Sequence, residues 1–230
     1  MTMIKICGVR DGAVLAAAVA AGATHIGFVF HPKSPRNLTV DAAIAAKEDA
    51  ARAGPIPTIV ALIADQDSAN IEALSADLAP DIIQCHGGET PAQMLALRAQ
   101  LPPAVRLWKA LGVHTIDDLR IAPAFARAVD ALVLDARAPA GTAYGGGHGR
   151  AFDWSVLGKG VAAGHLGAIP WVLAGGLTPE NVEAAIAQIA HLPGFAGVDV
   201  SSGVESAPGQ KDPAAIAAFI RRARRAMHRT

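Results

Sequence analysis

Residues Gly197-Val198-Asp199-Val200-Ser201-Ser202-Gly203-Val204-Glu205 form a short apolar run that leads directly into a turn of small residues. Upstream, Trp171-Val172-Leu173-Ala174 leads into Gly175-Gly176 in the same way. Small residues after a strand allow the backbone N–H groups to face a bound anion. Two successive strands with such turns are what a phosphate site at the C-terminal face of a (β/α)8 barrel requires. A sugar-phosphate enzyme is therefore the first hypothesis.

Short apolar runs alternate with helical patterns eight times along the 230 residues. We expect strands at Met3–Cys7, His25–Phe30, Thr58–Ile63, Ile82–Cys85, Arg106–Ala110, Ala131–Asp135, Trp171–Ala174 and Gly197–Val200. We expect helices at Arg10–Ala21, Val40–Ala53, Ser68–Leu78, Pro91–Leu101, Thr115–Phe125, Trp154–Leu157, Glu180–Ile189 and Pro213–Met227. This alternation indicates an α/β fold with a parallel sheet.

Eight such units predict one closed (β/α)8 TIM barrel, a single domain that covers residues 1–230. An open doubly wound sheet is the alternative. It usually has fewer strands and a glycine-rich turn at the first strand–helix crossing, whereas here the glycine-rich turns come late. A long loop, Ala136–Arg150, follows the sixth strand and contains Gly145-Gly146-Gly147-His148-Gly149. Loops of this length are usually functional or mobile, whereas Lys159–Gly167 is interpreted as a surface connection.

The composition excludes several kinds of partner. Twenty Lys and Arg residues balance twenty Asp and Glu residues, which argues against nucleic-acid and membrane partners. The apolar run Ala13–Ala21 follows Arg10 and Asp11 directly and lacks a cleavage pattern, so a first helix is preferred over a signal peptide. Cys7 and Cys85 show no zinc-like spacing. We therefore expect free thiols, no metal and a cytoplasmic protein, and leave the oligomeric state open.

Two side chains at predicted strand ends form a candidate acid–base pair. Cys7 ends the first strand and Asp135 the sixth, and both ends meet at the mouth of a barrel. Cys7 could instead be a buried structural thiol, and Asp135 a helix cap or a surface charge. A free thiol has a pKa of about 8.5, so a base role would require a nearby cation or helix dipole. Burial after an apolar run would keep a proton available on Asp135.

Other polar residues have two readings each. Arg36 could bind a carboxylate in a bidentate manner, or lie solvated in its loop. His86 could contact a ligand or be a hydrogen-bonded residue at a strand end, while Cys85 points to the other face and suits packing. Lys109 lies either inside the mouth or against a carboxylate. The arginine-rich run 221–225 is interpreted as a solvated helix face.

The ordered set of motifs resembles the phosphoribosylanthranilate isomerase family of tryptophan biosynthesis. The matching segments are Lys5-Ile6-Cys7-Gly8, Gly27-Phe28-Val29-Phe30, Ser34-Pro35-Arg36, Gln84, His86-Gly87, Leu134-Asp135, Gly146-Gly147-x-Gly149, Phe152-Asp153-Trp154, Ala174-Gly175-Gly176-Leu177, Pro179-Glu180-Asn181-Val182, Asp199–Glu205 and Gly209-x-Lys211-Asp212.

The resemblance implies a barrel of the ribulose-phosphate-binding type that needs no cofactor or metal. It implies an Amadori rearrangement of a small-molecule substrate, with Cys7 as general base and Asp135 as general acid. Arg36 would bind the anthranilate carboxylate, and His86 is a further candidate contact. The phosphate would bind at the turns that contain Gly175, Gly176, Ser202 and Gly203.

The chain departs from the family pattern at three places. His148 replaces a threonine, Cys85 replaces a leucine, and Ala61–Asp65 lacks the usual Val-Phe ending. Two alternatives stay open. The related aminoaldose isomerase of histidine synthesis has an Asp where this chain has Cys7, and a non-catalytic sugar-phosphate-binding barrel would need no acid–base pair.

Overall fold

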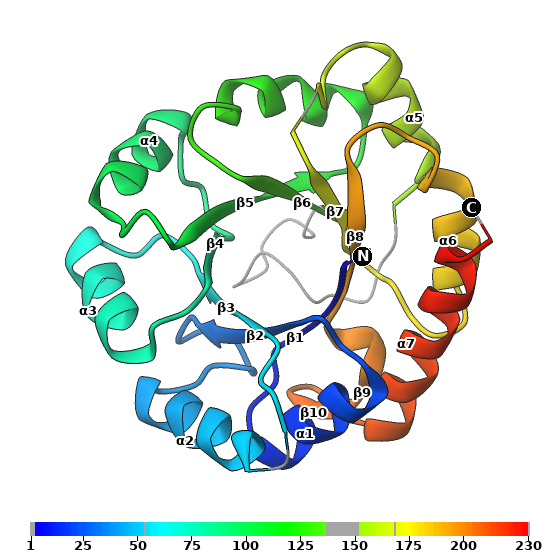
Figure 1. Cartoon of the computed structure of the whole chain (residues 1–230). Helices are drawn as coiled ribbons and strands as arrows, with labels where there is room; N and C mark the ends of the chain where they lie inside the picture. The colour runs from blue at the N-terminus through cyan, green and yellow to red at the C-terminus, as the bar shows by residue number, and fades with distance from the viewer. Residues whose placement is uncertain (1–2, 53, 137–151, 168, 230) are drawn as a thin grey trace.

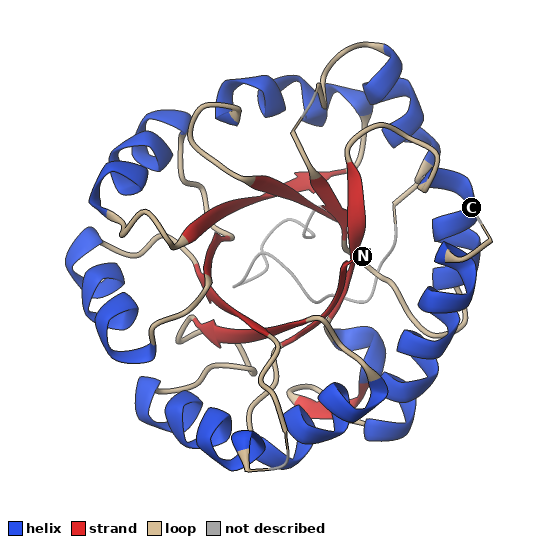
Figure 2. Ribbon diagram, in the orientation of Figure 1, coloured by secondary structure: helices blue, strands red, loops and turns tan. Residues whose placement is uncertain are grey.

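The computed structural model describes residues 3–52, 54–136, 152–167 and 169–229. Eight parallel strands close into a barrel in the order β1 to β8, and the helices form a ring around it (Figures 1 and 2). The (β/α)8 prediction is confirmed, and closure rules out the open doubly wound sheet. The barrel strands are β1 (Met3–Cys7), β2 (His25–Phe30), β3 (Thr58–Ile63), β4 (Ile82–Cys85), β5 (Arg106–Val113), β6 (Ala131–Ala136), β7 (Trp171–Leu173) and β8 (Phe195–Val200).

The outer ring consists of α1 (Gly12–Ala21), α2 (Val40–Ala51), α3 (Ser68–Leu78), α4 (Pro91–Gln100), the 3₁₀ helix η1 (Ile116–Phe125), α5 (Ser155–Ala162), α6 (Val182–Ile189) and α7 (Pro213–Met227). After β8 come a 3₁₀ turn, η2 (Ser202–Val204), and a small antiparallel hairpin of β9 (Glu205–Ala207) and β10 (Gln210–Lys211). This hairpin adds a second layer of side chains beside the mouth.

Several of the predicted helices differ in detail; the first, for example, begins at Gly12 rather than Arg10, because the Asp11 side chain caps it. The fifth is a 3₁₀ helix with Pro123 inside it, and proline has no N–H for an α-helical hydrogen bond. The seventh, α6, starts at Val182 rather than Glu180, because the Asn181 side chain accepts from Thr178 N and donates to Gly176 O, which holds a turn there. Finally, α5 continues to Ala162 and buries Gly160, so the interpretation of 159–167 as a connection was wrong for its first four residues.

Apolar side chains fill both sides of the barrel wall. Inside, a cluster contains Val60, Ile82, Trp108, Val133 and Val172; a larger core lies between the strands and the helices. Since side chains alternate along a strand, β1 sends Ile4 and Ile6 outward and Lys5 and Cys7 inward. The polar residues that point into the barrel therefore lie above this inner apolar cluster, at the C-terminal ends of the strands.

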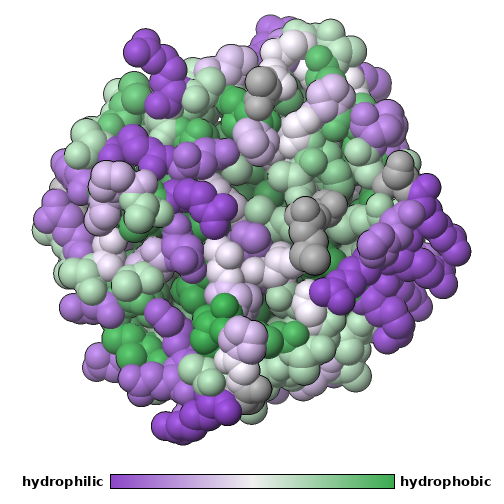
Figure 3. All heavy atoms as spheres, in the orientation of Figure 1, coloured by the Kyte–Doolittle hydropathy of each residue, from purple (hydrophilic) through white to green (hydrophobic). Residues whose placement is uncertain are grey.

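The arginine-rich part of α7 lies on the molecular surface, where Figure 3 shows hydrophilic side chains gathered over the region of α6 and α7. Arg222 donates to Pro179 O, Arg224 donates to Gly22 O, and Arg225 pairs with Glu183 at 2.9 Å. The run thus attaches the last helix to its neighbours, in agreement with the helix-face interpretation. Among the described residues, no helix combines the length and apolar character needed to cross a membrane.

His25 is a buried titratable group at the lower end of the barrel. Its ring stacks on Trp108 with 5.8 Å between centroids, and Nδ1 lies 2.8 Å from Thr24 Oγ1. Burial, assisted by Arg106 and Lys5, lowers the pKa of His25 to about 4. The neutral imidazole is therefore the form that the fold accepts.

We predict that His25 makes the protein less stable in acid. The unfolded chain takes up the proton near the ordinary histidine pKa of about 6.5, and the native state only near 4, so this contribution is full above pH 6.5 and is lost between these values. The loss amounts to about 3 kcal/mol. Urea unfolding of the wild type and of His25→Gln at several pH values measures it.

In that experiment His25→Gln should show a flatter dependence of unfolding free energy on pH, whatever its absolute stability. His191→Gln, at an exposed position, is the matched control and should keep the wild-type slope. An unchanged slope in His25→Gln would contradict the burial argument.

Candidate active site

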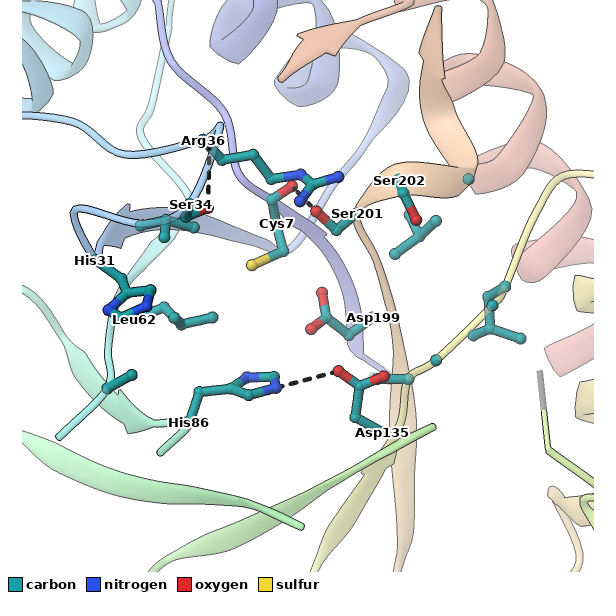
Figure 4. A pocket seen from close by; sticks show the side chains of 18 residues that line it. Cys7, His31, Ser34, Arg36, Leu62, His86, Asp135, Asp199, Ser201 and Ser202 are labelled. Atoms are coloured by element: carbon teal, nitrogen blue, oxygen red, sulfur yellow. Dashed lines mark hydrogen bonds and ion pairs between the residues drawn. The ribbon is translucent and has the colours of Figure 1, made fainter. Parts of the chain in front are cut away.

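A cavity opens where the eight strands end. It is lined by Cys7, Arg36, His86, Asp135 and Asp199, and by the turns that follow β7 and β8. Figure 4 shows the Cys7 thiol and the Asp135 carboxyl projecting from β1 and β6 toward this space, with Asp199 between them. The structure therefore brings together the predicted strand-end residues.

Cys7 has a distinctive electrostatic setting. The residue is 4% exposed, and its carbonyl oxygen accepts a hydrogen bond from Ser201 Oγ at 3.1 Å. Burial is the largest influence on the thiol and raises its pKa, as does the Asp199 carboxylate; the Lys5 and Lys211 ammonium groups oppose them. The cation that a base role requires is thus present, although its effect does not overcome burial in the ligand-free protein.

Asp135 forms a connected pair with His86. Asp135 Oδ1 accepts from the backbone N–H of Ala136 at 2.8 Å, and Oδ2 lies 3.2 Å from His86 Nε2. On the other side of the ring, Gln84 Nε2 lies 3.2 Å from Nδ1. The Gln84 amide and the Asp135 carboxyl group thus contact opposite sides of the imidazole ring. Gln84 and His86 together orient the carboxyl group.

Arg36 is held by a carboxylate of the protein itself. Its Nε and Nη2 atoms each lie 2.8 Å from an oxygen of Glu205, in a bidentate pair. Lys211 Nζ also contacts Glu205 Oε1, at 2.6 Å, and all three side chains are buried. Burial alone would raise the pKa of Glu205, but Arg36 and Lys211 outweigh it and lower that pKa. Glu205 and Lys211 belong to two of the motifs quoted from the sequence, but the sequence did not predict that they pair.

The two glycine- and serine-containing turns lie side by side. A Cβ atom on Gly203 would collide with the carbonyl oxygen of Leu177, so only glycine allows the turn after β8 to approach the turn after β7 this closely. Lys211 Nζ donates to Ser201 O at 2.9 Å, and Asn181 holds the turn at Gly176. The small residues of the two turns thus meet at the cavity, and Lys211 supports the second turn from the buried side.

The remaining candidates have structural positions. Lys109 Nζ pairs with Glu89 at 3.0 Å and donates to Gly87 O and Ala110 O, each at 2.8 Å, which anchors the loop after β4. Cys85 faces the helices in the apolar core, and burial raises the pKa of its thiol to about 12. Its predicted packing role agrees with this position. The glycine-rich segment 145–149 and His148 lie outside the described residues.

Among the described residues, no group of three or more His, Cys, Asp or Glu side chains is arranged to hold a metal ion. Cys7 and Cys85 are both free thiols. The chemistry that the visible groups offer is proton transfer, through a thiol and a carboxyl group at one cavity beside a cationic turn. The fold and the site thus define a (β/α)8 barrel with a thiol, a carboxyl group and two glycine-containing turns at one cavity.

Comparison with known proteins gives the family. The family model described as N-(5'-phosphoribosyl)anthranilate (PRA) isomerase matches residues 4–222. An N-(5'-phosphoribosyl)anthranilate isomerase of Paracoccus denitrificans is 45% identical over 223 residues, which cover 96% of each chain. The crystal structure of phosphoribosyl anthranilate isomerase from Thermotoga maritima superposes with a TM-score of 0.80 at 31% identity, covering 97% of this chain and 99% of that one.

A second solved phosphoribosyl anthranilate isomerase is in complex with reduced 1-(o-carboxyphenylamino)-1-deoxyribulose 5-phosphate. It has a TM-score of 0.78 and 28% identity to this chain, and the alignment covers 97% of this chain and 99% of that one. The present chain belongs to the phosphoribosylanthranilate isomerase family.

The buried cluster of Arg36, Glu205 and Lys211 predicts a large effect of one substitution. Glu205→Gln leaves two buried cations without their carboxylate and should lower the free energy of unfolding at pH 7 by about 3 to 5 kcal/mol. Because the pKa of Glu205 is lowered in the fold, its contribution is present above the ordinary glutamate pKa of about 4.3 and is lost as the pH falls further.

Chemical denaturation at pH 7 and below pH 4 tests this, with Glu48→Gln on the exposed face of α2 as the matched control. The wild-type and Glu205→Gln stabilities should converge in acid, and Glu48→Gln should behave as wild type. Equal stability of Glu205→Gln and wild type at pH 7 would show that the cluster contributes nothing to the fold.

Proposed function

We propose that the chain converts N-(5'-phosphoribosyl)anthranilate to 1-(2-carboxyphenylamino)-1-deoxyribulose 5-phosphate, in tryptophan biosynthesis, with Cys7 as general base and Asp135 as general acid. Membership of the isomerase family gives the reaction. The observation that supports the two roles is the placement of a thiol and a carboxyl group on one cavity whose wall includes the anion-binding turns.

The reaction needs one acid and one base. Asp135 donates a proton to the ring oxygen of the glycosylamine, the C1–O bond breaks, and the nitrogen lone pair forms an iminium. The iminium makes the proton on C2 acidic, and the Cys7 thiolate removes it. The electrons of the C–H bond then form an enolamine. It becomes the ketone as C1 takes a proton from water and the C2 hydroxyl releases one, while the thiol gives its proton to water and Asp135 regains one. Each positioned group typically contributes about 10²–10⁴-fold.

His86 supports the acid. Its Nε2 atom lies 3.2 Å from Asp135 Oδ2, so this contact holds the carboxyl group in position. Gln84 fixes the ring from the opposite side. His86 therefore serves Asp135 rather than reacting with the sugar itself.

The two ends of the substrate orient the reactive carbon. The phosphate binds at Gly175, Gly176, Ser202 and Gly203, next to the Lys211 ammonium. The anthranilate carboxylate binds the Arg36 guanidinium, whose plane Glu205 fixes through the Nε and Nη2 atoms. Holding both ends places C1 and C2 between thiol and carboxyl, which converts binding energy into orientation.

The proposal extends to the setting of the enzyme: one catalytic domain over residues 1–230, a small-molecule substrate, no cofactor, and a cytoplasmic location. The thiol at the end of β1 favours this reaction over the related histidine-pathway isomerisation, whose family has an Asp at that strand end. Incubation with each aminoaldose substrate distinguishes the two, and turnover of the histidine-pathway substrate alone would overturn the assignment.

Replacement of either proposed catalytic group should abolish most activity. Cys7→Ala and Asp135→Asn are each expected to lower kcat by about 10² or more, because one proton transfer loses its partner. Steady-state kinetics with phosphoribosylanthranilate measures this, and circular dichroism should show an intact fold. Cys85→Ala, at the second buried thiol, is the control and should keep wild-type turnover. Near-normal turnover in Cys7→Ala or Asp135→Asn would refute the assigned role.

Substitution of Arg36 tests the proposed binding of the anthranilate carboxylate. Arg36→Lys keeps the charge beside Glu205 but loses the planar fork, so substrate binding should weaken and KM should rise about tenfold, with a smaller change in kcat. The same steady-state assay measures both constants. A collapse of kcat at unchanged KM would contradict a binding role.

A further inference from the structure

A buried ion pair that the reaction scheme above does not use lies directly beneath the proposed base. Lys5 Nζ is 2.7 Å from Asp199 Oδ2, and the two side chains are 0% and 8% exposed. The residues face each other across the closure of the barrel, since Lys5 of β1 is the register partner of Asp199 of β8. Burial of such a pair is costly unless the geometry is good, so its presence needs an explanation.

The pair is in contact with Cys7. Lys5 and Cys7 are two residues apart on β1, so both side chains point into the barrel. Gly27 of β2 is the register partner of Cys7, and a Cβ atom built there would lie 2.8 Å from Cys7 Sγ and 3.2 Å from Lys5 Cε. The missing side chain of Gly27 thus leaves the space in which the ammonium arm and the thiol lie together.

Asp199 and Lys5 act on Cys7 with opposite signs. Burial works against the Lys5 ammonium, but Asp199 and Cys7 outweigh it and raise the pKa of Lys5, so the cation persists at neutral pH. The Lys5 ammonium favours the Cys7 thiolate through its charge and a hydrogen bond, whereas the Asp199 carboxylate disfavours it. Asp199 Oδ1 is buried and has no hydrogen-bond partner among the described residues.

The other charged groups near Cys7 are engaged elsewhere. Lys211 of β10 also favours the thiolate, but its ammonium is held by Glu205 and by Ser201. Arg36, His86 and Asp135 line the same cavity, Arg36 on Glu205 and His86 on Asp135. From β2, Gly27 and Val29 bring no charge. Lys5 is therefore the cation built into the strand that carries the thiol.

We propose that Lys5 is a positioning residue for the base. Its ammonium group, anchored by Asp199, stabilises the Cys7 thiolate. Lys5 thereby sets the pH above which Cys7 is ionised and can accept the substrate proton. This inference rests on the proposed role of Cys7 in turnover. On this proposal, the Lys5–Asp199 pair that closes the barrel also controls the charge state of the neighbouring Cys7 thiol.

The pH dependence of Cys7 alkylation by iodoacetamide tests the proposal without any turnover. The rate is measured by mass spectrometry on ligand-free protein between about pH 6 and pH 10, in a Cys85→Ala background so that one thiol remains. Lys5→Met should move the inflection up by about one pH unit or more, a roughly tenfold loss of thiolate below it. Asp199→Asn should move it down.

Two further variants make the result specific. Lys5→Arg keeps a cation and should restore most of the wild-type inflection, which also covers the case in which Lys5→Met fails to fold around an unpaired Asp199. Lys47→Met is the matched control, since Lys47 on α2 donates to Leu78 O far from the mouth and should leave the inflection unchanged. Circular dichroism confirms that each variant is folded.

The activity of Lys5→Met gives a second readout. Its kcat/KM should fall about tenfold at neutral pH and recover as the pH rises through the new inflection, which a merely structural defect would not do. An unmoved alkylation inflection in folded Lys5→Met, or shifts of the same direction in Lys5→Met and Asp199→Asn, would overturn the proposal. Failure of the proposed function is a separate result: normal turnover by Cys7→Ala.

Discussion

The parallel pairing of β1 with β8 fixes where the polar side chains of the barrel lie. It closes the barrel with Met3 opposite Gly197 and Lys5 opposite Asp199. The same register brings Ser201 to Cys7, where the serine hydroxyl donates to the cysteine carbonyl. A shift of one residue would turn Lys5 and Cys7 into the apolar layer under the helices. The pairing that closes the barrel therefore also brings the residues of the site together.

Charge is distributed in layers above this closure. An apolar floor around Trp108 and Val133 excludes water from the centre of the barrel. Above it lie buried ionic groups, among them Lys5 with Asp199, and Arg36 with Glu205 and Lys211. Because a buried charge is costly without a partner, each set fixes the positions of its members closely. These ion pairs thus fix the positions of Cys7, of Arg36 and of the turn after β8, where the proposed base, the carboxylate site and the phosphate site lie.

Much of the fold follows from the sequence because strand periodicity and glycine turns are local signals. All eight strands were predicted to within a few residues, and the Gly175-Gly176 and Ser202-Gly203 turns lie at the mouth as expected. Two of the errors arose where a single residue acts on the backbone: Asn181 delays the start of α6, and Pro123 interrupts the hydrogen bonding of η1. Neither effect changes the hydrophobic periodicity from which helices are predicted.

The site could be predicted only as single residues at strand ends. Cys7, Asp135 and Arg36 were selected from their positions, and the structure places all three on one cavity. Their partners could not be predicted, because Arg36 and Glu205 are 169 residues apart in sequence and Lys5 and Asp199 are 194 apart. Pairings at such separations exist only after the barrel has closed.

Isotope release shows whether the Cys7 thiolate removes the proton from C2 of the ribose, the step on which the proposed reaction depends. Substrate labelled with tritium at C2 is incubated with wild-type protein and with Cys7→Ala, and the label that appears in water is counted. We expect release by the wild type and almost none by Cys7→Ala. Release by Cys7→Ala at the wild-type rate would contradict it.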